Sequence, residues 1–61
     1  MDDKQLLTIN EVAKYLQMHP RTIMRMVDRG ELPAVRIGKS VRFEVETVRA
    51  FVEANTERTG G

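Results

Sequence analysis

Cysteine is absent from this chain of 61 residues, and histidine occurs only once. Without cysteine the chain forms no disulfide and no thiolate metal site, and one histidine is too few for a zinc site. No apolar run is long enough to span a membrane, and the first residues lack the basic-then-apolar order of a signal peptide. These absences predict a cytoplasmic protein with no metal, no other cofactor and no membrane partner.

The chain is also short for an enzyme. Its 61 residues allow one small domain, whose core is expected to contribute only a few kcal/mol, roughly 3–5. An enclosed catalytic pocket with its supporting shell is not expected at this length. The sequence also shows no pairing of a nucleophile with a base and no metal-ligating cluster. We therefore predict that the protein is not an enzyme.

Positive charge is concentrated in residues 20–42. This segment holds six basic side chains against two acidic ones, a balance of +4, whereas residues 1–19 carry −1 and residues 43–61 carry −2. A solvated face would normally mix the two signs, so this polarity favours a surface that binds a polyanion such as nucleic acid. The alternative is that the charge run is only a solvated face.

The first half of the chain predicts two short helices. Thr8 and Glu11 have the spacing of a capping box, and apolar residues at helical spacing follow, which predicts a helix over 9–16. After a turn of three residues, Pro20 suits the first position of a second helix, and Gly30 suits the position just past its end. Two helices joined by such a turn form a helix-turn-helix.

Arginine recurs every fourth residue on the second helix, at Arg21, Arg25 and Arg29, and so forms one stripe. The apolar stripe on its other side consists of Ile23, Met26 and Val27. Arginine is well shaped for bidentate contact with guanine, and Arg25 is the predicted base-reading residue. Arg29 is expected to meet phosphate or solvent, and Asp28 and Glu31 are expected to temper the stripe.

A β-hairpin is predicted next, because two segments that alternate apolar and basic residues, 35–37 and 41–43, flank Gly38. A loop of three residues keeps the apolar side chains on one face, whereas a loop of two would pair apolar with basic positions. The longer loop predicts three cross-strand pairs: Val35 with Phe43, Arg36 with Arg42, and Ile37 with Val41. Opposed arginines repel each other, so this arrangement favours a polyanion lying against the hairpin.

The last predicted element is a helix over 46–55 with a neutral to acidic outer surface, which we interpret as a brace that closes the core. The inward residues of this helix are predicted to be Val48, Phe51 and Val52. The predicted organisation is a flexible N-terminus over 1–5, one α+β domain over 6–54, and a flexible tail over 55–61.

Three segments carry a family resemblance: LTINEVAKYL at 7–16, PRTI at 20–23 and RGELPAVRIG at 29–38. Together they resemble the excisionase family of helix-turn-helix proteins, which shares the winged-helix core of MerR-type regulators. The resemblance covers roughly residues 6–53 and implies a small winged helix-turn-helix. It also implies that the second helix enters the major groove of double-stranded DNA and that the hairpin, as a wing, reaches the neighbouring minor groove.

Carried over by position, the resemblance implies two groups of DNA contacts. The expected contacts are Arg21, Thr22 and Arg25 to bases or flanking phosphates, and Arg36, Lys39 and Arg42 to the backbone or minor groove. Family members usually place serine or threonine at the position of His19, as a cap for the recognition helix. Histidine is a poorer cap. His19 is therefore expected either to contact a phosphate or to be an exposed turn residue without a role.

The function implied is that of a sequence-specific DNA-binding protein, acting as an excisionase-like architectural factor in site-specific recombination. Its expected partners are double-stranded DNA, an integrase or recombinase, and further copies of itself bound cooperatively. One alternative is a small MerR-like transcriptional regulator. Such regulators usually continue into a long dimerising helix, whereas this chain ends after the brace. The other alternative is a protein-interaction module that offers the same basic face to an acidic partner.

Overall fold

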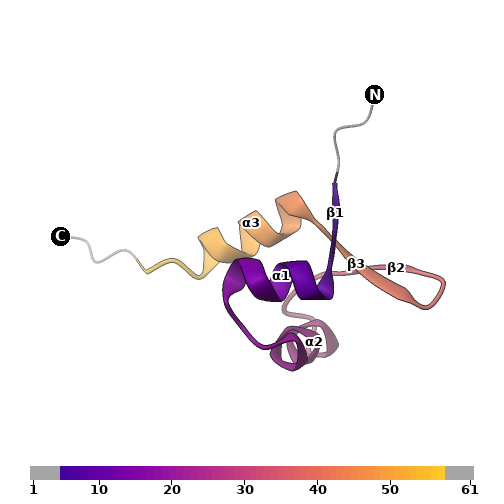
Figure 1. The fold of residues 1–61 in the computed structure, drawn as a ribbon. Helices are drawn as coiled ribbons and strands as arrows, with labels where there is room; N and C mark the ends of the chain where they lie inside the picture. The colour runs from indigo at the N-terminus through magenta and orange to yellow at the C-terminus, as the bar shows by residue number, and fades with distance from the viewer. Residues whose placement is uncertain (1–4, 58–61) are drawn as a thin grey trace.

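The computed structural model describes residues 5–57 as an α+β domain with three helices and three strands. The elements in chain order are β1 (Leu6–Thr8), α1 (Ile9–Leu16), α2 (Pro20–Asp28), β2 (Val35–Ile37), β3 (Ser40–Glu44) and α3 (Val45–Ala54) (Figure 1). The predicted winged helix-turn-helix class is confirmed. Within the termini predicted to be flexible, residues 1–4 and 58–61 lie outside the described range.

Helix α1 is closed at both ends by local hydrogen bonds. At its start the predicted capping box is present, because the Glu11 amide donates to Thr8 Oγ1 at 3.1 Å and the Thr8 amide donates to Glu11 Oε1 at 2.8 Å. At its end Gln17 adopts a left-handed conformation with φ of 56°, and the Met18 amide donates to the Ala13 carbonyl at 2.8 Å. These bonds satisfy backbone groups that a free helix end would expose.

Helix α2 starts and stops at the residues that the sequence predicts. Pro20 occupies its first turn, where the missing amide proton matters least. Gly30 follows its last turn with φ of +78°, a conformation that glycine adopts easily. The Gly30 amide donates to the Val27 carbonyl at 3.0 Å and the Glu31 amide to the Met26 carbonyl at 2.8 Å, which completes a Schellman motif.

The sheet contains a third strand that the sequence analysis did not predict. Its order is β1-β3-β2 with antiparallel pairs, and Leu7 of β1 lies opposite Phe43 of β3. Strand β1 has three residues, too few for a visible alternation, and its partner lies far along the chain. It fixes the start of α1 to the base of the wing formed by β2 and β3.

The predicted register of the wing is wrong. Its cross-strand pairs are Val35 with Arg42, Arg36 with Val41 and Ile37 with Ser40. The loop is therefore the two-residue Gly38-Lys39, and Gly38 has φ of +60°, which suits the first central position of a type II′ turn. The preference of Gly38 for a two-residue turn outweighs the register that the apolar pattern of the strands favours. As a result Ile37 is 54% exposed, and the two wing arginines lie on opposite faces.

One small core joins the elements, and among the described residues it contains no polar side chain. The core residues are Val12, Ala13, Ile23, Met26, Leu32, Phe43 and Val48. Because Ile23 and Phe43 share this core, α2 lies on the Phe43 face of the sheet. Val52, predicted to point inward, is 37% exposed because α3 packs through Val48 and, partly, Phe51.

Candidate nucleic-acid interface

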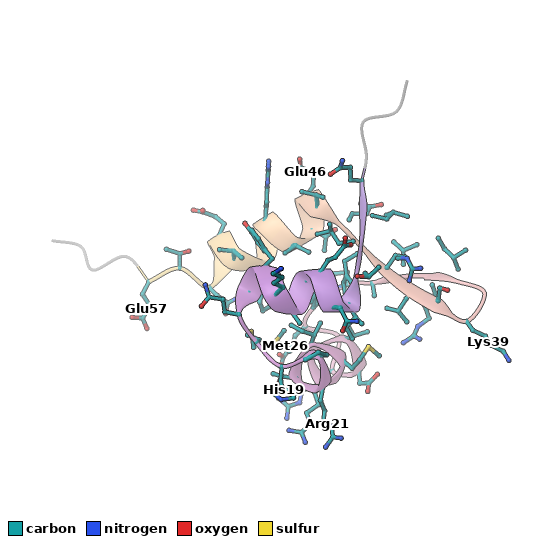
Figure 2. The ribbon with its side chains drawn as sticks, viewed as in Figure 1. His19, Arg21, Met26, Lys39, Glu46 and Glu57 are labelled. Carbon is teal, nitrogen blue, oxygen red and sulfur yellow. The ribbon has the colours of Figure 1, made fainter. Side chains whose placement is uncertain are left out.

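The face of α2 that points away from the core is basic. Ile23 and Met26 are buried, whereas Arg21 and Arg25 are exposed on the other side of the same helix. Figure 2 shows Arg21 projecting from the side of α2 that is turned away from α1. The two arginines are four residues apart, so their side chains are neighbours on this face. The structure thus brings together two of the predicted contact residues on one open surface.

The N-terminus of α2 has no side-chain cap. His19 precedes the helix with extended geometry, φ −71° and ψ 139°, and its side chain makes no capping hydrogen bond. The expectation that histidine is a poor cap is thereby confirmed. The amides of Arg21 and half-buried Thr22 therefore lack the kind of acceptor that Thr8 supplies to α1. The side chains that line an open hollow at this helix end are His19, Pro20, Arg21, Thr22 and Arg25.

The wing divides its basic residues between two faces. Arg36 lies opposite Val41 and so shares the Phe43 face of the sheet, on the side of α2, while Lys39 projects from the wing tip (Figure 2). Arg42 lies on the other face, is half-buried, and its Nη1 donates to the Val41 carbonyl at 2.9 Å. The predicted opposition of two arginines is therefore wrong. The structure places Arg36 on the α2 side of the sheet, Arg42 on the other face and Lys39 at the wing tip.

The two acidic residues near the arginine stripe behave differently. Arg29 Nη1 lies 3.9 Å from Glu31 Oε2, and because both side chains are largely exposed this ion pair contributes little to stability. Asp28 is exposed as well, but within residues 5–57 its carboxylate takes part in no hydrogen bond or ion pair. Glu31 thus tempers the stripe as predicted, whereas Asp28 remains a free carboxylate.

The opposite side of the molecule, formed by α3, carries the acidic side chain of Glu46. Glu46 projects from α3 on the side away from Arg21 (Figure 2), and its Oε2 lies 3.8 Å from Arg49 Nη1. The basic side chains of α2 and Arg36 of the wing therefore lie on the side away from Glu46, whereas Arg42 lies on the other face of the sheet. Such a surface attracts a polyanion by charge and offers arginine and amide donors to it.

Across residues 5–57 the structure has no apolar helix of membrane-spanning length. The same residues include no group of histidine and acidic side chains that could hold a metal ion.

A helix-turn-helix domain model matches residues 6–56, nearly all of the described chain. The chain belongs to this family. Two strains of Mycobacterium tuberculosis carry relatives named "Putative DNA-binding protein", each 43% identical over 51 residues, which cover 84% of this chain and 65% of the relative. The chain thus spans about 65% of the length of these curated relatives. The "Uncharacterized protein YvgK" of Bacillus subtilis is 31% identical over 51 residues, covering 84% of this chain and 17% of that protein.

Proposed function

We propose that this helix-turn-helix domain binds double-stranded DNA at a specific sequence, with α2 in the major groove and the wing at the neighbouring minor groove. The observation that carries this proposal is that basic side chains of α2 and of the wing lie on the same side of the domain. Arg21 and Arg25 of α2 face away from the core, and Arg36 of the wing lies on the α2 side of the sheet. The names of the Mycobacterium relatives support the same function.

Helix α2 has the dimensions and side chains for the major groove. An α-helix with its side chains is about 10–12 Å wide, and the major groove is about 12 Å wide. Arg25, supported by Arg21, is proposed to donate two hydrogen bonds to O6 and N7 of guanine. Thr22 and Arg29 lie toward the flanks of this face and are proposed to meet phosphates, which fix the register of the helix on the duplex.

The open N-terminus of α2 is proposed to receive a phosphate. The amides of Arg21 and Thr22 point along the helix axis without a side-chain acceptor, and the helix dipole favours an anion at this end. His19 lines the same hollow and is proposed to stand beside that phosphate. A DNA phosphate would then take the place of the missing cap.

The wing is proposed to approach the minor groove with Lys39 at its tip and Arg36 on its inner face. Narrow minor grooves have an enhanced negative potential that attracts such side chains. Arg42, whose guanidinium is bonded to its own strand, is proposed to contribute less to binding.

A salt titration tests this arrangement. If four or five basic groups neutralise phosphates, the slope of log affinity against log salt should be about −4. Arg36→Gln should make the slope shallower by about one, and the matched variant Arg42→Gln should leave it nearly unchanged. Binding without salt dependence, or NMR shifts on DNA addition that are confined to α3, would contradict the proposal.

The finer role that we propose is that of an excisionase-like architectural factor, which bends DNA, binds repeated sites cooperatively and works with an integrase or recombinase. The segment RGELPAVRIG supports this role through its resemblance to that family. Gel-shift and bending assays on tandem sites, with and without an integrase encoded beside the gene, test it. Independent binding to unbent DNA would favour the MerR-like regulator. A preference for acidic polypeptide over duplex DNA would favour the interaction module.

A further inference from the structure

Asp28 occupies a place on α2 that neither local stability nor charge pairing explains. Aspartate is a weak helix former, and a negative charge in the last turn opposes the helix dipole. Asp28 is the last residue of α2 and is exposed, and within residues 5–57 its carboxylate has no hydrogen-bond or ion-pair partner. By contrast the nearby Glu31 lies within an ion pair with Arg29. The free carboxylate on the basic face thus calls for a different explanation.

The helical spacing places Asp28 among the proposed DNA contacts. Arg21, Arg25 and Asp28 stand at positions i, i+4 and i+7, which lie on one face of an α-helix, and all three are exposed. This face is opposite the buried Ile23 and Met26. A carboxylate here repels every phosphate that approaches, so it weakens binding to DNA in general.

We infer that Asp28 is a specificity-determining residue, which accepts a hydrogen bond from the exocyclic N4 amino group of a cytosine in the major groove. This inference rests on the proposed DNA binding. Aspartate accepts from cytosine N4, and no phosphate offers it a donor. At sites without that cytosine the carboxylate, which bound DNA would cover, would remain unpaired next to the polyanion. Asp28 therefore separates the correct site from others largely by penalising the others.

The test starts with wild-type protein and the duplex that it selects from a random pool. Each base pair of that duplex is then changed in turn, and affinities are measured for wild type, Asp28→Ala and Asp28→Asn. At one C·G pair, a change of base should lower the affinity of wild type about tenfold. The same change should lower the affinity of Asp28→Ala about twofold or less. Asp28→Ala should also bind scrambled duplex more tightly. Asp28→Asn should shift the preference at that pair toward adenine, to which asparagine forms two hydrogen bonds.

A matched control removes the same charge on the far side of the molecule. Glu46→Gln on α3 should leave the preference at every base pair as in wild type. Thermal melts verify that the Asp28 variants are folded, with stability equal to wild type or higher. If both Asp28 variants keep the wild-type preferences, or strengthen all duplexes by one factor, this inference is overturned while the proposed function stands. If wild type selects no duplex, both are overturned.

Discussion

Helices α1 and α2 are almost equal in length, eight and nine residues, but their ends are built differently. Helix α1 has a complete capping box, with acidic Glu11 in its first turn and basic Lys14 in its last, as the helix dipole favours. Helix α2 has no side-chain cap and no acid in its first turn, and its last turn holds basic Arg25 but ends on acidic Asp28. The first helix is thus arranged for folding. The second gives up local stability and keeps its N-terminal donors available to an external anion.

The largest effect is expected where the two helices share the core. Ile23 is fully buried, and Ile23→Ala should lower the free energy of unfolding by about 2–5 kcal/mol. A domain this small is expected to have only roughly 3–5 kcal/mol to lose, so the variant should be largely unfolded at 25 °C in circular dichroism. The control on the opposite face of α2, Arg25→Ala, should change stability by less than about 0.5 kcal/mol. A cooperative melt of Ile23→Ala near that of wild type would contradict this account of α2 packing.

The next effect separates base reading from phosphate binding. Arg25→Ala should reduce the discrimination between the selected site and a scrambled duplex by about 1–3 kcal/mol, because it removes contacts to a base edge. Lys39→Ala at the wing tip should instead weaken both duplexes by similar factors. Affinities measured by fluorescence anisotropy at one salt concentration distinguish the two variants. Equal losses on both duplexes for Arg25→Ala would place Arg25 on the phosphates.

The features of both helices that the sequence analysis predicted correctly are those set by local chemistry. Thr8 with Glu11, Pro20 and Gly30 each act within one turn of chain, and the structure confirms all of them. The wing register depended instead on a choice between strand pattern and turn type. Gly38 was the signal for the correct choice, since glycine favours the first position of a tight type II′ turn.

Features that depend on distant partners could not be predicted in this way. Strand β1 forms because it pairs with β3, with Leu7 opposite Phe43, and no local sequence pattern predicts this pairing. The exposure of Val52 depends likewise on how α3 meets the rest of the domain. For the candidate site, the stripe of arginines was visible in the sequence. Two other features follow only from the fold: Arg36 and Arg42 lie on opposite faces of the wing, and the carboxylate of Asp28 has no partner.

A smaller effect is expected when α1 is made to resemble α2. Thr8→Ala removes the acceptor for the Glu11 amide and should lower the free energy of unfolding by about 1 kcal/mol, within a range of 0.5–2. DNA affinity, corrected for the folded fraction, should stay at the wild-type value because Thr8 lies outside the basic face. Urea denaturation and DNA titration measure the two quantities. A loss of affinity in the folded variant would mean that the start of α1 belongs to the interface.

The smallest effect is expected when α2 is made to resemble α1. In His19→Ser the hydroxyl would accept from an amide of the first turn of α2, which has no side-chain cap, and should raise the free energy of unfolding by up to ~1 kcal/mol. If the imidazole also stands beside a DNA phosphate, the same variant should bind DNA more weakly. Thermal melts and DNA titrations of both proteins measure the two effects separately. A variant that matches wild type in melting and in binding would show that His19 is a turn residue only. The missing side-chain cap of α2 would then have no role in DNA binding.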